Sequence, residues 1–372
     1  MHAFPHTESG FILARDVRAV GQEAGLRAAV AAGEMVRTRR GVYRDATVAR
    51  SEEARSERDA LRYRADVLAA VEVLLAPTFT SFSAIALHGL PIFGRWPRDA
   101  YVLSGSSTGH RRKGLIAVAS LRAAPGTTVV GGIRCTTVEY SLIQLCRHAT
   151  LAAALTAVDA AVHTPRFGRA RPLTTISRLR AEHRRLLPYH GSQRTEAVLG
   201  RATTEADTPL ETVSRLVIEE LGFAAPDLQH RLWLPELKQE AFIDFHWPDV
   251  SAGAEADGGG KYLAPALAAA GRWSPPGDGQ RADPEVAATA AREAAAAVIK
   301  EKERENAVRR QLRAFDRWNW AETMARTPLA HRLMAMGVPR PRAPRMLLGD
   351  QDAPAARRIR RARRTTIAPA TD

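Results

Sequence analysis

Cysteine is scarce in this chain, and its scarcity excludes two kinds of protein. The 372 residues include two cysteines, Cys135 and Cys146, which are too far apart to form a CxxC pair. A disulfide framework and a cysteine-based zinc site are therefore excluded, and a reducing cytoplasm is the expected compartment. The eleven histidines are scattered and form no HExxH motif, so we expect no zinc enzyme.

Long apolar runs are also missing. The longest uncharged stretch, residues 73–94, contains Pro77, His88 and Pro91, which disfavour a membrane-spanning helix. The first ten residues contain no apolar segment of the kind that a signal peptide carries. We therefore expect a cytoplasmic protein that does not enter a membrane.

Lysine is rare, yet the chain is strongly basic. Fifty-four Lys and Arg residues stand against 40 Asp and Glu residues, giving a formal net charge of +14, and only five of the cations are lysine. A soluble chain this basic most often binds a polyanion such as DNA. The apolar fraction of 45% and the charged fraction of 25% are those of a globular protein, and the length predicts two or three domains.

The first unit, residues 10–50, has the outline of a winged helix-turn-helix. Apolar residues at helical spacing predict helices over 13–20 and 22–32, and strands at 35–39 and 42–44 predict a hairpin. Phosphate contacts need cations on a rigid element, which a wing provides. The expected nucleic-acid-binding residues are Arg27, Arg37, Arg39, Arg40 and Arg44. The alternative is that these arginines form an ordinary solvated face.

The middle unit, residues 57–190, is predicted to be a mixed α/β domain. Its hydrophobic periodicity predicts strands at 100–104, 114–121 and 129–136, helices at 61–75, 81–88, 139–147, 151–163 and 173–187, and a linker at 188–192.

Parts of these two units resemble the AbiEi-type antitoxins of type IV toxin–antitoxin systems. Residues 33–43 (GEMVRTRRGVY) resemble the G-x-L-x-R-x-R-x-G-V-Y wing of that family, and residues 81–91 (SFSAIALHGLP) resemble its helix ending in HGLP. Residues 132–137 and 142–147 resemble the strand-to-helix segment that follows. The resemblance covers residues 10–165. It implies a winged helix ahead of an antitoxin-like domain, repression of the protein's own operon, and a nucleotidyltransferase-like toxin as a partner.

The third unit, residues 205–325, begins with a well-marked helix. Thr208 at the N-cap, Pro209 at the first helical position and Glu211 at the third predict a helix that ends near residue 220. The sequence further predicts strands at 229–234 and 241–247, a strand ending at 255–257, a flexible insertion at 263–283, a long helix at 283–314 and a strand at 315–320. Residues 326–372 are predicted to be a disordered basic tail, with six arginines at 357–364.

Carboxylates lie on two neighbouring strands of this unit. Asp244 lies within the apolar segment 242–247, and Glu255 and Asp257, two residues apart, share one face of the next strand. Carboxylates on adjacent strands can hold Mg²⁺, which lowers the pKa of a bound water molecule. The pattern predicts metal-assisted phosphodiester hydrolysis, with Asp244 and Glu255 as the metal ligands.

This arrangement resembles the PD-(D/E)xK nuclease fold, and more narrowly the very-short-patch-repair-like endonuclease domain. In that domain a helical Glu precedes a D-F strand and an E-x-D-G strand. The resemblance implies a restriction-endonuclease-like α/β domain and assigns catalytic positions to Glu211, Asp244, Glu255, Asp257 and Lys261. It also implies that Lys300, Lys302 and Arg304 on the long helix face the nucleic acid.

The chain departs from the nuclease pattern at Asp257, where E-x-K requires a lysine. Glu211 also has a second explanation, as the Glu of a capping box. Three functions therefore stay open: a DNA-binding regulator or antitoxin with a nuclease-like domain, an active Mg²⁺-dependent DNA endonuclease targeted by its winged helix, and an antitoxin that acts on a partner protein.

Overall fold

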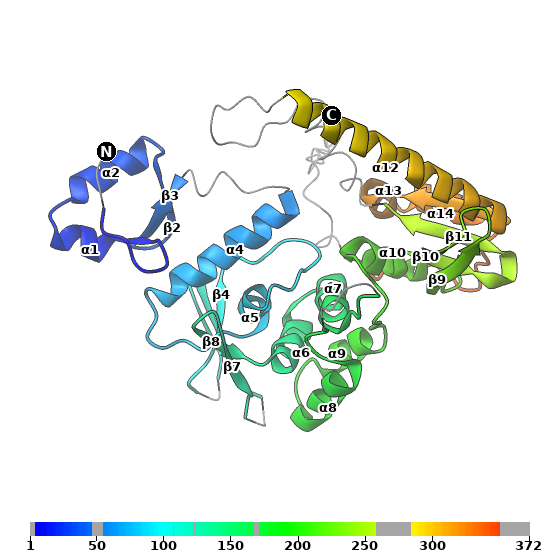
Figure 1. Ribbon diagram of the computed structural model, residues 1–372. Helices are drawn as coiled ribbons and strands as arrows, with labels where there is room; N and C mark the ends of the chain where they lie inside the picture. Colours follow the sequence, from blue (N-terminus) through cyan, green and yellow to red (C-terminus); the bar gives the residue numbers. More distant parts are fainter. Residues whose placement is uncertain are drawn as a thin grey trace, which may run out of the picture.

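The computed structural model describes residues 4–46, 55–106, 108–121, 124–166, 171–257 and 284–349. It is a mixed α/β protein with several β-sheets (Figure 1). Within these residues, no helix combines the length and the apolar character needed to cross a lipid bilayer. Lys261, the predicted insertion at 263–283 and the arginine-rich segment 357–364 lie outside the described residues.

The N-terminal unit is a small sheet with two helices. Its elements are β1 (Ile12–Leu13), α1 (Ala14–Ala19), α2 (Glu23–Ala31), β2 (Met35–Arg39) and β3 (Val42–Asp45), with the strand order β1-β3-β2. Val17 and Leu26 on the helices pack against Ile12 in a small core of their own. Gly41 has a φ of +77° at the turn between β2 and β3, a conformation that favours glycine. The predicted pair of helices followed by a hairpin is confirmed, with β1 added ahead of the first helix.

The strands of the middle unit form two groups that one residue joins. It contains α4 (Arg55–Val71), α5 (Ser81–Leu87), β4 (Ala100–Leu103), β5 (His110–Arg112), β6 (Leu115–Val118), β7 (Thr127–Val130) and β8 (Ile133–Thr136). Phe79 forms bridges to Val102 in β4 and to Cys135 in β8, and so joins the two groups of strands. The single strand predicted at 129–136 is wrong. Gly131 and Gly132, both with positive φ, instead turn the chain between β7 and β8, as a Gly-Gly pair often does in a hairpin.

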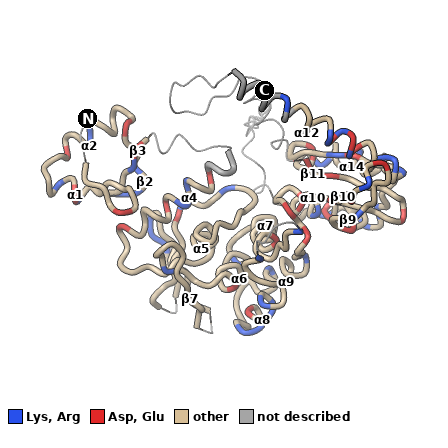
Figure 2. Tube along the Cα trace, in the orientation of Figure 1, with Lys and Arg blue, Asp and Glu red and all other residues tan. Residues whose placement is uncertain are grey.

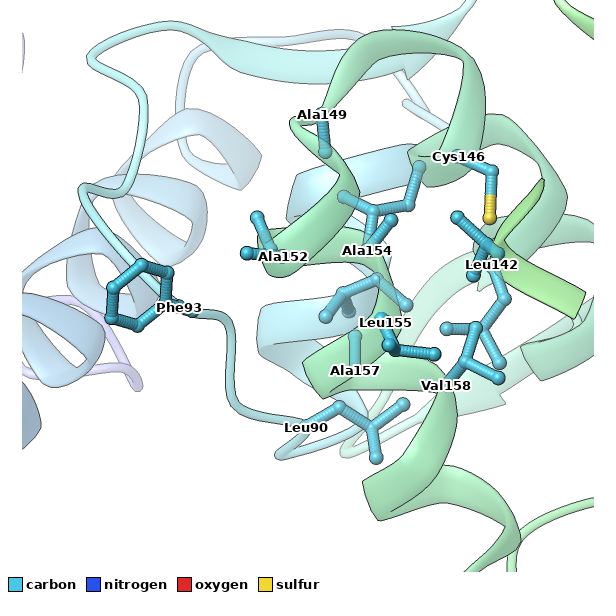
Figure 3. Close-up of a cluster of buried hydrophobic side chains, with 14 of the residues drawn as sticks. Leu90, Phe93, Leu142, Cys146, Ala149, Ala152, Ala154, Leu155, Ala157 and Val158 are labelled. Atoms are coloured by element: carbon cyan, nitrogen blue, oxygen red, sulfur yellow. The ribbon is translucent and has the colours of Figure 1, made fainter. Parts of the chain in front are cut away.

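Helices α6 (Val138–His148), α7 (Leu151–Val162), α8 (Ile176–Leu186) and α9 (Ser192–Leu199) complete this unit. Figure 3 shows Leu155 and Val158 of α7 packed with Leu142 and Cys146 of α6, in the interior of the unit. Helix α7 is buried along almost its whole length, and its small alanines allow neighbouring helices to approach closely. Helix α9 begins inside the predicted 188–192 linker, which is therefore part of the folded unit.

The C-terminal unit is a four-stranded sheet between two helices. Its elements are α10 (Pro209–Glu220), β9 (Asp227–Leu234), β10 (Gln239–Trp247), β11 (Ala252–Ala256), α12 (Pro284–Gln311) and β12 (Ala314–Trp318). The strand order is β12-β11-β10-β9; β9, β10 and β11 are antiparallel, and β12 is parallel to β11. Phe245 and Trp318 face α10, where the Trp318 indole donates to Ser214 Oγ at 2.9 Å. Ile243 packs against Val308 of α12 on the other face.

The chain folds back after β12, so the tail predicted from residue 326 is wrong for residues 326–349. Helices α13 (Trp320–Ala325) and α14 (Thr327–Ala335) follow β12 directly, and Leu329 and Leu333 are fully buried. The segment after α14 returns to the C-terminal end of α10. There the buried carboxylate of Glu220 pairs with Arg326 and accepts the backbone N–H groups of Leu347 at 3.0 Å and Leu348 at 2.8 Å.

The middle and C-terminal units share one hydrophobic core. Asp159 on α7 is 1% exposed and binds Arg215 of α10 at 2.6 Å and Thr212 of α10 at 2.9 Å. Its other oxygen accepts the backbone N–H of Thr203 at 3.0 Å. The boundary predicted between residues 190 and 205 therefore lies within a packed joint.

We expect Glu220→Ala to lower the free energy of unfolding by about 3 kcal/mol, because it leaves the partly buried Arg326 guanidinium and two backbone N–H groups without their acceptor. Denaturant unfolding of the full chain measures this loss. Glu240→Ala removes an exposed partner of Arg231 and should cost about 1 kcal/mol or less. Equal losses in the two variants would contradict the role of Glu220 in closing the fold.

Candidate functional site

Three of the five arginines that the sequence predicts to bind nucleic acid project into solvent. Arg27 is exposed on α2, and Arg37 and Arg40 are exposed on the hairpin formed by β2 and β3. Figure 2 shows basic residues at intervals along α1, α2 and β2, with acidic residues between them. Arg37 is partly fixed, since its Nε donates to the carbonyl oxygen of Arg39 at 3.3 Å.

Arg39 and Arg44 instead lie against the middle unit. The Arg39 guanidinium donates to the carbonyl oxygen of Gly114 and, at 3.4 Å, to that of Asp66 on α4. Burial lowers the pKa of Arg39, and the charge of Asp66 opposes that shift. Burial raises the pKa of Asp66, which the charges of Arg62, Arg39 and Arg44 counteract. Leu13 and Val42 pack on Ala69 of α4 beside this contact, so these two arginines help attach the N-terminal unit to its neighbour.

Glu211 stands at the N-terminus of α10, where its side chain takes part in the cap of the helix. Its backbone N–H donates to Thr208 Oγ1 at 3.3 Å, and its Oε1 accepts from the same hydroxyl at 2.8 Å. Its Oε2 accepts the backbone N–H of Asp207 at 3.0 Å and the side-chain amide of Gln229 at 2.9 Å. The cap therefore fixes a carboxylate that also faces the sheet.

A local irregularity in the sheet turns Asp244 toward Glu211. Gln229 on β9 has a φ of +49°, which is unusual for a residue other than glycine. Across this point the side chains no longer alternate, because Ile243 faces α12 whereas Phe245 faces α10. Asp244 therefore meets Gln229, whose Nε2 donates to Asp244 Oδ1 at 3.0 Å. One amide nitrogen thus joins two carboxylates from α10 and β10.

This carboxylate pair is electrostatically unusual. Burial raises the pKa of Asp244 to about 7, and the charges of Glu211 and Glu255 add to the shift, while the N–H of Ala256 at 2.8 Å opposes it. Burial also raises the pKa of Glu211. In the part of the chain that the structure describes, neither carboxylate forms an ion pair. One shared proton or one added cation would therefore relieve their repulsion.

Glu255 faces the other helix. Its carboxylate binds Arg304 of α12 at 2.8 Å and Arg317 of β12 at 3.0 Å. Glu301 lies at 2.8 Å from Arg304 and at 3.3 Å from Arg317, so these charges balance one another. Glu255 therefore shares no hydrogen-bond partner with Asp244 among the described residues. Arg304, which the nuclease resemblance places toward nucleic acid, pairs with Glu255 and Glu301.

Asp257 follows β11, where its N–H donates to the carbonyl oxygen of Trp318 at 2.8 Å. Its charge helps to raise the pKa of Arg317. Lys300 and Lys302 are exposed on α12. Gln229 is the residue that sequence reasoning missed, because only the pairing of β9 with β10 places its amide between Glu211 and Asp244.

Of the two predicted metal ligands, Asp244 has surroundings that suit a divalent cation and Glu255 does not. Glu211 and Asp244 offer two hard oxygen ligands without a counter-charge among the described residues, as Mg²⁺ and Mn²⁺ prefer. Glu255 does not fit, because two guanidinium groups occupy its oxygens. No group of three or more His, Cys, Asp or Glu residues suited to a metal ion occurs in the described ranges, so within them Glu211 and Asp244 are the two acidic ligands on offer.

Comparison with known proteins identifies no relative of this chain. No family model matches it, and no curated protein or solved structure is significantly similar to it.

The pKa of Asp244 predicts how stability depends on pH. Because its folded-state pKa of about 7 exceeds the ordinary 3.8, the native state retains a proton that the unfolded chain loses between about pH 4 and pH 7. Stability should therefore fall as the pH rises through this window in metal-free buffer. In Asp244→Asn this contribution should vanish, so that the difference in unfolding free energy between wild type and variant changes with pH.

Urea unfolding at pH 5, 6, 7 and 8 measures this difference. Asp59→Asn removes an exposed carboxylate of α4 and serves as the matched control, with a profile parallel to wild type. A parallel profile for Asp244→Asn as well would show that the carboxylate pair does not titrate in this range.

Proposed function

We propose that this chain is a DNA-binding protein whose N-terminal unit is a winged helix, and that it acts as a regulator or antitoxin of its own operon. The observation that carries the proposal is the set of outward arginines Arg27, Arg37 and Arg40, held on a helix and an adjoining hairpin of one compact unit. Cations fixed on rigid elements are suited to the phosphate groups of a duplex.

The attachment of this unit to the middle unit supports the same proposal. Arg39 and Arg44 interact with α4. Arg27, Arg37 and Arg40 are therefore the arginines that can bind a partner. The middle unit would then act as a rigid body carried beside the DNA, where a nucleotidyltransferase-like toxin is the partner that the antitoxin resemblance implies.

We expect Arg37→Ala/Arg40→Ala to weaken duplex DNA binding for every sequence tested. Each lost phosphate contact should also flatten the slope of log K against log [salt] by about 0.9. Fluorescence anisotropy with labelled duplexes at several salt concentrations measures both effects.

The matched control is Arg180→Ala/Arg184→Ala, which removes two exposed arginines from α8, far from the N-terminal unit in Figure 1. It removes the same amount of positive charge and should keep the wild-type slope of log K against log [salt]. If both double variants lose the same slope, binding depends on net charge and the N-terminal unit is not the DNA site.

A second candidate function is cation-dependent phosphodiester cleavage by the C-terminal unit. The observation that favours it is the pair formed by the buried Glu211 and the half-buried Asp244, joined by Gln229 and without a counter-charge in the described residues. The order α10-β9-β10-β11-α12-β12 supports a nuclease-like domain of the PD-(D/E)xK type, with one carboxylate from the helix and one from the sheet.

In this proposal the residues of the chain bind and orient. A bound Mg²⁺ or Mn²⁺ would lower the pKa of water and stabilise charge on a phosphate oxygen. Glu211 and Asp244 would hold that cation, and the Thr208 cap and Gln229 keep their carboxylates in place. Asp244, with a pKa near 7 before the cation binds, exchanges its proton readily at neutral pH.

We expect Glu211→Gln and Asp244→Asn each to abolish Mg²⁺- or Mn²⁺-dependent nicking of supercoiled plasmid and to leave duplex binding unchanged. Glu205→Gln, an exposed neighbour ahead of α10, is the matched control and should cleave like wild type. If wild type neither cleaves DNA nor shows a thermal shift with either metal, the acid pair is structural and the cleavage proposal fails.

A further inference from the structure

An exposed row of side chains lies beside Glu211 and Asp244, the acid pair, on the hairpin formed by β9 and β10. In the register of these strands Phe242 is paired with Arg231, and Glu240 with Trp233. Side chains of directly paired residues share a face, as do residues two apart on one strand. Arg231 and Trp233 therefore continue the face on which Gln229 meets Asp244. At about 3.3 Å per residue, the row from Gln229 to Trp233 is about 13 Å long.

A second arginine reaches this face from the middle unit. Arg166, which follows α7, places its guanidinium carbon 4.3 Å from the centre of the Phe242 ring. Its side chain is exposed, and stacking on the face of a ring does not use the N–H groups of a guanidinium. The row thus contains two aromatic rings and two guanidinium groups beside the acid pair.

The outer part of this row is open to solvent. Trp233 is 57% exposed and the Arg231 side chain is 67% exposed. Helix α12 packs on the opposite face, through Leu232 and Leu234, and α10 packs against β11 and α13 (Figure 1). Tryptophan is enriched at binding surfaces, because its large ring supplies contact area and its N–H can donate a hydrogen bond.

We propose that Arg166, Arg231, Trp233 and Phe242 bind an unpaired nucleic-acid strand and lead it to the acid pair. Guanidinium groups bind the phosphates of such a strand, and the exposed Trp233 indole stacks on its bases, while the Phe242 ring positions the Arg166 guanidinium. This site is distinct from the N-terminal unit, which takes duplex DNA in the proposed function.

The choice of an unpaired strand rests on the geometry of stacking. In a duplex each base face is already covered by its neighbours, and moving one base out of the stack costs a few kcal/mol. The exposed Trp233 indole on this sheet face can stack only on a base that is already unstacked. Glu240 pairs with Arg231 at 2.9 Å, but an exposed ion pair is weak enough to exchange for a phosphate.

The test uses the full chain in the Arg37→Ala/Arg40→Ala background, which removes the proposed duplex contacts. Binding of a fluorescein-labelled 20-nucleotide oligo(dT) is measured by anisotropy without metal. In this background, Trp233→Ala should weaken oligo(dT) binding by roughly five- to 150-fold, the range for losing one stacked base. Trp233→Phe should restore most of the affinity. Arg166→Ala and Arg231→Ala should each flatten the salt slope by about 0.7.

Val129→Ala is the control for loss of an exposed apolar side chain on another sheet, and it should leave oligo(dT) binding unchanged. Circular dichroism and thermal melts confirm that each variant is folded. Unchanged oligo(dT) affinity in Trp233→Ala overturns the proposal. That result is expected if this face instead binds an acidic protein. Loss of affinity in Trp233→Ala that phenylalanine restores supports the proposal, whether or not the N-terminal unit binds duplex DNA or the acid pair cleaves.

Discussion

One buried carboxylate, Asp159, fixes helix α10 and with it Glu211 against the middle unit. An ionised group at 1% exposure is costly unless its partners are in place, and these partners, Arg215, Thr212 and Thr203, lie beyond the middle unit. The joint therefore fixes α10 against α7. Because α10 begins two residues before Glu211, the same joint sets where the capped carboxylate stands.

The sheet supplies the second constraint. A regular β10 would place Asp244 on the α12 face, beside Glu255, because side chains alternate and the two strands are neighbours. The irregularity at Gln229 and Asp244 reverses that alternation, so the two acids face different helices. Asp244 is left with the Gln229 amide and a backbone N–H group as partners, whereas Glu255 is neutralised by Arg304 and Arg317. The unneutralised pair is the part of this unit that can respond to protons or cations.

Arginine has two different roles in this molecule, and its position along the chain does not reveal which. Arg39, Arg215, Arg304 and Arg317 are partly buried and hold carbonyl or carboxylate oxygens between elements. Arg27, Arg37, Arg40 and Arg231 are exposed and can exchange their contacts for phosphate. The planar guanidinium suits both roles, since it satisfies several acceptors when buried and pairs with oxyanions when exposed.

The sequence by itself determined most of the local structure. Hydrophobic periodicity predicted α2, α6, α7, β9, β10 and α12 within a few residues, and Thr208, Pro209 and Glu211 marked the start of α10, because these signals act over one or two turns of chain. It did not reveal the hairpin at Gly131 and Gly132, the folded segment 326–349, or the role of Gln229. Tertiary structure decided that Asp244 meets Glu211 and not Glu255, and that Trp233, Arg231 and Arg166 share one face. Those arrangements depend on strand register, on a local reversal of alternation and on the α7–α10 joint, which involve residues far apart in the chain.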